Sequence, residues 1–230
     1  MLGTSWVRVT DDIAYRTVRE NFAALLAEPG ARADVRVPAC PGWTVRDVVA
    51  HMVDNVLTAL SQASVAPPEV PAADASPAQL LGTWLRLGRG LDVHLHANDG
   101  ERGPALLVMD AFTHEIDLRY AIGAPVPAEH VAYRRALGLL TAGFGESVRG
   151  HDLPSVRVVC DGAEWVCGPG APAVTLVGSR HDVHRALAGR RSHAQIAAMG
   201  WSDDPTRWLP AFTWGPFTPP AAPGDVLSAG

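Results

Sequence analysis

Asp110 and His114 stand four residues apart in a segment with a helical pattern, so both side chains project from one face. Asp117, three residues further on, shares that face, and in an earlier helical segment His51 lies at the edge of an apolar stripe. A carboxylate and two imidazoles that converge in a helical core would make a three-ligand site for a divalent metal, with a position left for water or substrate. This ligand set suits zinc, with nickel, iron or manganese as alternatives.

Ordinary structural roles are also open for these residues. Asp110 or Asp117 could pair with Arg119, and a histidine beside valines is commonly a hydrogen-bonded core residue. Asp92 and His96 form another i,i+4 pair and are the second candidate for a metal site. The sequence contains no G-x-S-x-G, Walker, H-E-x-x-H or dinucleotide-loop pattern, so it does not indicate those hydrolases or nucleotide binding.

The elements that must position these residues are helices over most of the first 150 positions. Apolar residues at helical spacing predict helices over 10–28, 44–62, 77–97, 104–122 and 128–148. Thr44 with Asp47 has the form of a capping box, and Ser76-Pro77 is a typical helix start. Short connections predict an antiparallel four-helix bundle, with residues 65–76 as a loop.

The pattern changes after Gly150. Short β-branched segments predict strands within 155–162, 163–168 and 173–178, and two short helices are expected over 179–187 and 192–199. We therefore predict an α+β fold with two domains, a helical bundle over 1–150 and a small α/β domain over 151–230.

Composition narrows the classes of partner. The net charge is −5 and all 19 basic residues are arginine, so neither nucleic acid nor an anionic membrane surface is favoured as a partner. The arginine bias, with abundant Ala, Gly and Pro, suggests a high-GC bacterium. No signal peptide or membrane-spanning run is visible.

The number and spacing of the cysteines indicate the redox state of the cellular compartment. There are three of them, with no C-x-x-C pair, which fits a reducing cytoplasm. Cys160 and Cys167 could pair across a hairpin, but two free thiols in the core are the favoured interpretation.

Three segments resemble one family in the right order along the chain: CPGWTVRDVVAHMVDN, DAFTHEIDLRYAIG and GRRSHAQIAAMGWSDDP. They are similar to segments of the mycothiol-dependent maleylpyruvate isomerase family, within the DinB-like metalloenzyme superfamily. The resemblance implies a DinB-like four-helix bundle followed by a small α/β domain. It also implies that His51, Asp110 and His114 are the metal ligands. The family usually has glutamate where this chain has Asp110, which is one methylene shorter, so an altered geometry is expected.

The resemblance further implies an enzyme that uses a low-molecular-weight thiol, mycothiol in actinobacteria. A divalent cation lowers the pKa of a thiol that it binds, so a thiolate forms at neutral pH and can attack an electrophilic carbon. An isomerase would release the thiol after rotation about the former double bond, whereas an S-transferase would release the conjugate. The expected partners are mycothiol and a small electrophile, and the protein is expected to be a monomer or homodimer.

Five other residues are predicted at the site. We expect Asp117, Arg86 and Arg190 to take part in catalysis and Arg89 and Arg191 to bind the cofactor. A ligating histidine normally donates its second N–H to a partner such as Asp117, and arginines are natural clamps for carboxylates. Exposed arginines that are merely solvated are the alternative.

Three functions remain open at this point. The first is a thiol-dependent isomerase or S-transferase acting on a small electrophile. The second is its specialised form, which attaches mycothiol to an intermediate of secondary metabolism. The third is a non-catalytic metal- or ligand-binding protein that keeps the fold, an option raised by the aspartate at position 110.

Overall fold

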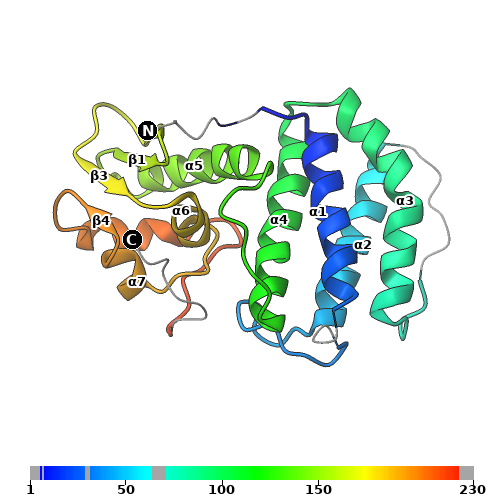
Figure 1. Ribbon diagram of the computed structural model, residues 1–230. Coiled ribbons are helices and arrows are strands. Elements are labelled where there is room, and N and C mark those ends of the chain that lie inside the picture. Colours follow the sequence, from blue (N-terminus) through cyan, green and yellow to red (C-terminus); the bar gives the residue numbers. More distant parts are fainter. Residues whose placement is uncertain (1–5, 7, 29–31, 64–70, 223–230) are drawn as a thin grey trace. The chain divides into compact units, whose positions relative to one another are not determined.

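The structure is a computed structural model that describes residues 6, 8–28, 32–63 and 71–222 (Figure 1). The chain divides into two compact units. The helical unit is Arg8–Ala132, and the C-terminal unit is Tyr133–Gly230 together with Met1–Val7. Each unit is described by itself below.

The helical unit is a four-helix bundle. Its helices are α1 (Asp11–Leu26), α2 (Val45–Gln62), α3 (Pro77–Ala97) and α4 (Arg102–Ile122). α1 and α2 each pack against both α3 and α4, so the four helices enclose one core (Figure 1). The predicted bundle is confirmed, as is the α+β class of the chain.

Local signals set the helix ends. The Thr44 side chain accepts a hydrogen bond from the Asp47 backbone N–H, and the Asp47 carboxylate accepts one from the Thr44 N–H, which completes the predicted capping box of α2. Ser76 and Gln79 cap α3 in the same reciprocal way. α4 stops at Gly123, whose φ of 69° is left-handed and suits glycine.

Aromatic and charged groups fix the α1–α3 contact. Trp84 of α3 is fully buried and meets the edges of Tyr15 and Phe22 of α1. Further along, Arg19 of α1 makes two hydrogen bonds, of 3.0 and 2.9 Å, to the carboxylate of Asp92 on α3. α1 and α3 are therefore held in one register by both packing and a paired charge.

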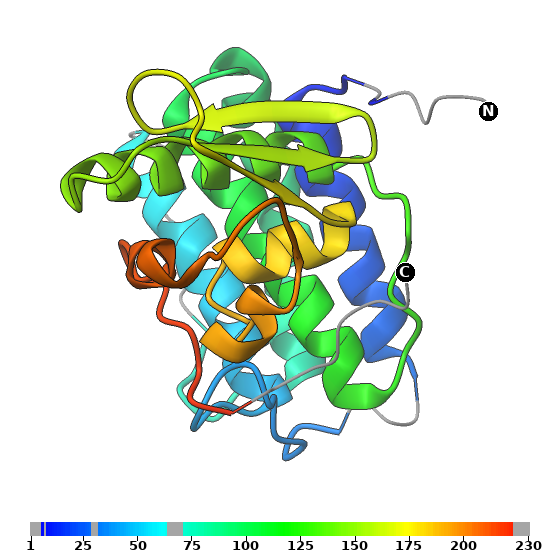
Figure 2. The same cartoon turned by 90° about the vertical axis from the view of Figure 1, so that its left-hand side faces the viewer.

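The C-terminal unit combines a mixed sheet with helices. Its elements are α5 (Tyr133–Gly150), β1 (Val156–Cys160), β2 (Ala163–Cys167), β3 (Val174–Val177), α6 (Arg180–Leu187), α7 (His193–Ala197), β4 (Gly200–Trp201) and the 3-10 helix η1 (Thr206–Phe212). The strand order is β2-β1-β3-β4, with β1 antiparallel to β2 and parallel to β3. α5 packs along β1 and β2, beside the yellow strands in Figure 2, and also contacts α6 and η1.

The structure differs from the sequence-based expectations at two places. The division between the units falls between Ala132 and Tyr133, whereas we expected a boundary near residue 150. The physical reason is that the apolar face of α5 packs on the sheet and α6. β4 and η1 were not expected from the sequence, and residues 65–70 of the predicted 65–76 loop lie outside the described residues.

Cys160 and Cys167 are free and buried. The strand register pairs Cys160 with Ala163 and Cys167 with Val156, so the two thiols lie at opposite ends of the β1–β2 pair. This confirms the interpretation of both as core residues. Within the described parts of the chain, no helix is long and apolar enough to cross a membrane.

Candidate metal centre

The bundle brings the three predicted ligands together from two helices. His51 lies on α2, and Asp110 and His114 lie one turn apart on α4. One ligand atom from each residue can be chosen so that all three lie within 4.8 Å of one another. The carboxylate is between the rings: Asp110 Oδ2 is 3.2 Å from His51 Nε2, and Asp110 Oδ1 is 3.7 Å from His114 Nε2.

These distances fit one shared cation. Two atoms bonded to the same zinc ion at about 2.1 Å lie about 3.4 Å apart at the tetrahedral angle. The two N–O distances, 3.2 and 3.7 Å, lie on either side of this value. His114 is buried, while the side chains of His51 and Asp110 are 31% and 33% exposed, so the cluster has one accessible side. The donor set, two imidazoles and one carboxylate, matches a divalent metal with open positions.

The second ring nitrogen of His114 is held by a buried carboxylate. Asp117 is 0% exposed, and its Oδ2 lies 3.1 Å from His114 Nδ1. The thiol of Cys40 donates to the same oxygen at 3.4 Å, and its Sγ is 3.7 Å from His114 Nδ1. A carboxylate at Nδ1 favours the tautomer that carries its proton there, which leaves the Nε2 lone pair facing Asp110.

Trp43, in the loop before α2, packs against the imidazole rings of His51 and His114. Trp43 stacks on His114 with ring centroids 5.6 Å apart, and its centroid is 5.1 Å from that of His51. Hydrogen bonds fold the loop back on itself, because Val37 N–H donates to Trp43 O and Trp43 N–H donates to Cys40 O. The loop therefore delivers both Cys40 and Trp43 to the centre.

Tyr15 of α1 is a further buried group in the electrostatic surroundings of the centre. Burial raises the pKa of its hydroxyl far above the ordinary value, and the negative charge of Asp110 adds to this increase. Tyr15 is therefore a neutral residue at any physiological pH.

Comparisons with known proteins point to one family. Residues 15–111 match the family described as the mycothiol maleylpyruvate isomerase N-terminal domain. This match lies within the helical unit of the chain. The family resemblance expected from the three sequence segments is thereby confirmed.

Two solved structures share the fold. One is the crystal structure of the mycothiol-dependent maleylpyruvate isomerase, with a TM-score of 0.56, and the other is its His-to-Ala mutant, with a TM-score of 0.57. Each has 14% sequence identity, and the alignment covers 84% of this chain and 92% of the isomerase chain. The similarity therefore extends beyond the isomerase N-terminal domain into the C-terminal unit. A search of curated proteins found no match.

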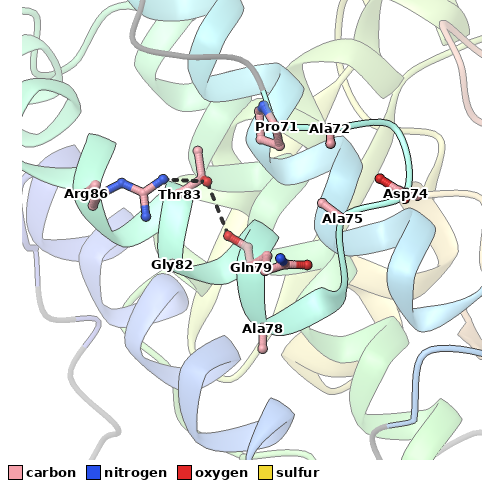
Figure 3. Close-up of a pocket in the computed structure, with 9 residues that line it drawn as sticks. All are labelled: Pro71, Ala72, Asp74, Ala75, Ala78, Gln79, Gly82, Thr83 and Arg86. Atoms are coloured by element: carbon pink, nitrogen blue, oxygen red, sulfur yellow. Dashed lines mark hydrogen bonds between the residues drawn. The ribbon is translucent and has the colours of Figure 1, made fainter.

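The helical unit places Arg86 and Arg89 on α3. Arg86 lines a cavity of about 520 Å³ and donates to the Thr83 hydroxyl at 2.8 Å, while Thr83 donates to the Gln79 carbonyl (Figure 3). Arg89 is exposed. Among the described residues, no hydrogen bond or ion pair joins either arginine to His51, so their roles toward substrate or cofactor stay predictions.

Arg190 and Arg191 belong to the C-terminal unit. Arg190 donates to the Ala188 carbonyl at 2.8 Å. Arg191 is fully buried and donates to Asp182 Oδ1 at 2.8 Å, an ion pair within the unit. Their predicted roles in catalysis and cofactor binding also stay predictions.

The residues that the sequence offered for other pairings have different partners in the helical unit. Arg119 pairs with Glu115 at 2.7 Å. Asp92 binds Arg19, and His96 lies 3.3 Å from Asp12, so the described contacts do not bring the second candidate pair together as a metal site.

Sequence reasoning missed three residues at the centre: Cys40, Trp43 and Asn55. Only Asn55 had a local signal, because it follows His51 by four residues on the same helix. Cys40 and Trp43 reach the centre through the fold of a loop, which helical spacing cannot show.

Proposed function

We propose that this chain is a divalent-metal-dependent enzyme that uses mycothiol as an isomerase or S-transferase on a small electrophilic substrate. The observation that carries the proposal is the convergence of His51, Asp110 and His114. It occurs in a domain whose family is described by a mycothiol-dependent isomerase. Zinc is the metal that the donor set favours.

A divalent cation at this centre would lower the pKa of a bound thiol, so that it exists as the nucleophilic thiolate at neutral pH. The chain's own residues prepare this chemistry. His51 and His114 supply neutral nitrogen donors, and Asp110 supplies the negative charge. Asp117 fixes the tautomer and orientation of His114 through Nδ1.

The two outcomes of the reaction begin with the same step. The thiolate sulfur would form a bond to the electrophilic carbon of a substrate double bond, while the π bond at that carbon breaks and its electron pair moves onto the rest of the substrate. In an isomerase this bond breaks again after rotation, and the thiol is regenerated. In an S-transferase the bond is kept in the product. The charge and geometry of the centre serve either outcome, because both need the thiolate.

Metal analysis and ligand stabilisation test the proposal. The purified protein is expected to hold one ion per chain, and His51→Ala and Asp110→Ala should each abolish stoichiometric metal. Mycothiol should raise the melting temperature of the metal-loaded protein, because a ligand that binds only the folded state stabilises it by RT ln(1 + [L]/Kd). Unchanged metal content in both variants would refute the ligand set. Metal binding without any effect of mycothiol would favour a non-catalytic metal protein.

Turnover distinguishes the isomerase from the S-transferase. With maleylpyruvate and mycothiol, an isomerase regenerates free thiol, whereas an S-transferase consumes it in step with the electrophile. Titration of free thiol at the end of the reaction separates the two. The predicted reducing compartment and the monomer or homodimer state are further parts of the proposal.

A further inference from the structure

Asn55 lies against two of the three proposed ligands. It follows His51 by one helical turn on α2 and projects from the same face. Its Nδ2 donates to Asp110 Oδ2 at 2.8 Å and lies 3.2 Å from His51 Nε2. The amide is therefore as close to these two ligand atoms as they are to each other, since Asp110 Oδ2 and His51 Nε2 are 3.2 Å apart.

We propose that Asn55 is a fourth metal ligand, through its side-chain oxygen Oδ1. The assignment rests on the metal centre of the proposed function. In the structure the N–H end of the amide faces the Asp110 carboxylate, as a donor should. A cation at the centre would favour rotation of the amide by half a turn so that Oδ1 faces it, because the positive charge attracts the oxygen and repels the N–H group.

The spacing fits a coordination shell. Atoms bonded at about 2.1 Å to one ion are separated by about 3.0 Å at right angles and by about 3.4 Å at the tetrahedral angle. The triangle of Asn55, Asp110 and His51 has sides of 2.8, 3.2 and 3.2 Å. Asn55 is only partly buried, so its side chain has room to rotate.

The chemistry also gives the extra ligand a reason. Asp110 is one methylene shorter than glutamate. A cation bound to it would therefore lie closer to α4 and farther from α2 than a cation bound to glutamate. An oxygen from α2 would make up for this on the His51 side. The resulting set of two imidazoles, one carboxylate and one amide has two oxygen donors, which favours harder divalent metals such as manganese or iron more than three ligands alone would.

Asn55 could instead act only as a hydrogen-bond donor that orients the Asp110 carboxylate. The two roles use opposite ends of the amide and can be separated. Leucine has a similar shape but neither oxygen nor N–H. Aspartate keeps the oxygen and cannot donate.

Cobalt(II) is a suitable probe, because its visible spectrum reports the number and geometry of its ligands. Metal-free wild type, Asn55→Leu and Asn55→Asp are titrated with Co²⁺, and affinities are measured by competition with a chelator. Asp54→Asn is the matched control, because Asp54 is the neighbouring exposed polar residue on α2. Urea unfolding of each metal-free variant verifies the fold.

If Asn55 is a ligand, Asn55→Leu should weaken Co²⁺ binding by at least about 10- to 100-fold. That is the effect of losing a residue that only hydrogen-bonds to a metal ligand. Its spectrum should also change, whereas Asn55→Asp and Asp54→Asn should keep the wild-type spectrum. Weaker binding with an unchanged spectrum in Asn55→Leu would show a donor role and overturn the assignment. So would unchanged affinity.

Failure of the proposed function has a different signature. Wild type would then bind no Co²⁺ at this centre, or His51→Ala would bind it as well as wild type. That result would overturn the metal centre and the role of Asn55 together. Binding that needs His51 but is unaffected by Asn55→Leu would overturn the role of Asn55 alone.

Discussion

Replacing Asp117 with asparagine should weaken metal binding at the proposed centre without removing any of the proposed ligands. The Asp117 carboxylate is fully buried and lies 3.1 Å from Nδ1 of His114. Asparagine keeps the size of the side chain and can still offer an oxygen to Nδ1, but it is neutral. The variant therefore isolates the effect of one negative charge next to Nδ1 of His114, a proposed ligand.

The magnitude follows from the hydrogen bond. A hydrogen bond to a charged group contributes about 1.5–3 kcal/mol, and a neutral one about 0.5–1.5 kcal/mol. The loss is thus about 1–1.5 kcal/mol, and since about 1.4 kcal/mol is a factor of ten, metal affinity should fall about 10-fold. This agrees with the lower end of the 10- to 100-fold effect known for groups that orient metal ligands.

The assay is competition for zinc against a chromophoric chelator, on protein whose fold is verified by circular dichroism. Glu115→Gln is the matched control, because Glu115 is also a fully buried carboxylate on α4 but pairs with Arg119 and His130. That variant should lose unfolding free energy and keep its zinc affinity. Equal zinc affinity in Asp117→Asn and Glu115→Gln would refute the reasoning.

Three predictions concern stability and are measured by urea unfolding beside wild type. Thr44→Ala should cost about 1 kcal/mol. Hydrogen bonds from the Thr44 backbone N–H and from its hydroxyl lower the pKa of Asp47, and the variant removes only the hydroxyl bond. Part of the cost should therefore be present above the unfolded pKa near 3.8 and be lost as pH falls below it, and a constant cost would contradict this. Gly88→Ala should destabilise by about 1–3 kcal/mol, because its Cβ would lie 2.6 Å from Arg19 Cζ and the guanidinium could move away only by giving up its two hydrogen bonds to Asp92. Stabilisation, the usual effect of this substitution in a helix, would show that Arg19 yields without loss. Burial lowers the pKa of His181 to about 4, so as pH falls the unfolded chain takes up a proton before the folded chain does. The free energy of unfolding should therefore decrease from pH 6.5 toward pH 4. His181→Gln should flatten this pH dependence, and an unchanged dependence would exclude His181 as its cause.

Much of the fold could be predicted because its signals are local. The capping pairs at Thr44 and Ser76 and the left-handed Gly123 mark helix ends with residues adjacent in the chain. Strands β1, β2 and β3 followed from short β-branched segments between turns. These preferences act over a few residues, so the sequence shows them without knowledge of the partner surfaces.

Assignment of α5 to a unit had no local signal. Its apolar face fits a bundle or a sheet equally well, and only the folded chain shows that it packs on β1 and β2. The short strand β4 is similar, because two residues become a strand only through pairing with β3.

The centre divides in the same way. The spacing of Asp110 and His114 already places them one turn apart, because an α-helix repeats every 3.6 residues. His51 joins them only through the packing of α2 against α4, and Cys40 and Trp43 only through a folded loop. Helical periodicity determines which residues share a face, whereas tertiary packing determines which faces meet, because contacts between distant segments depend on the whole core.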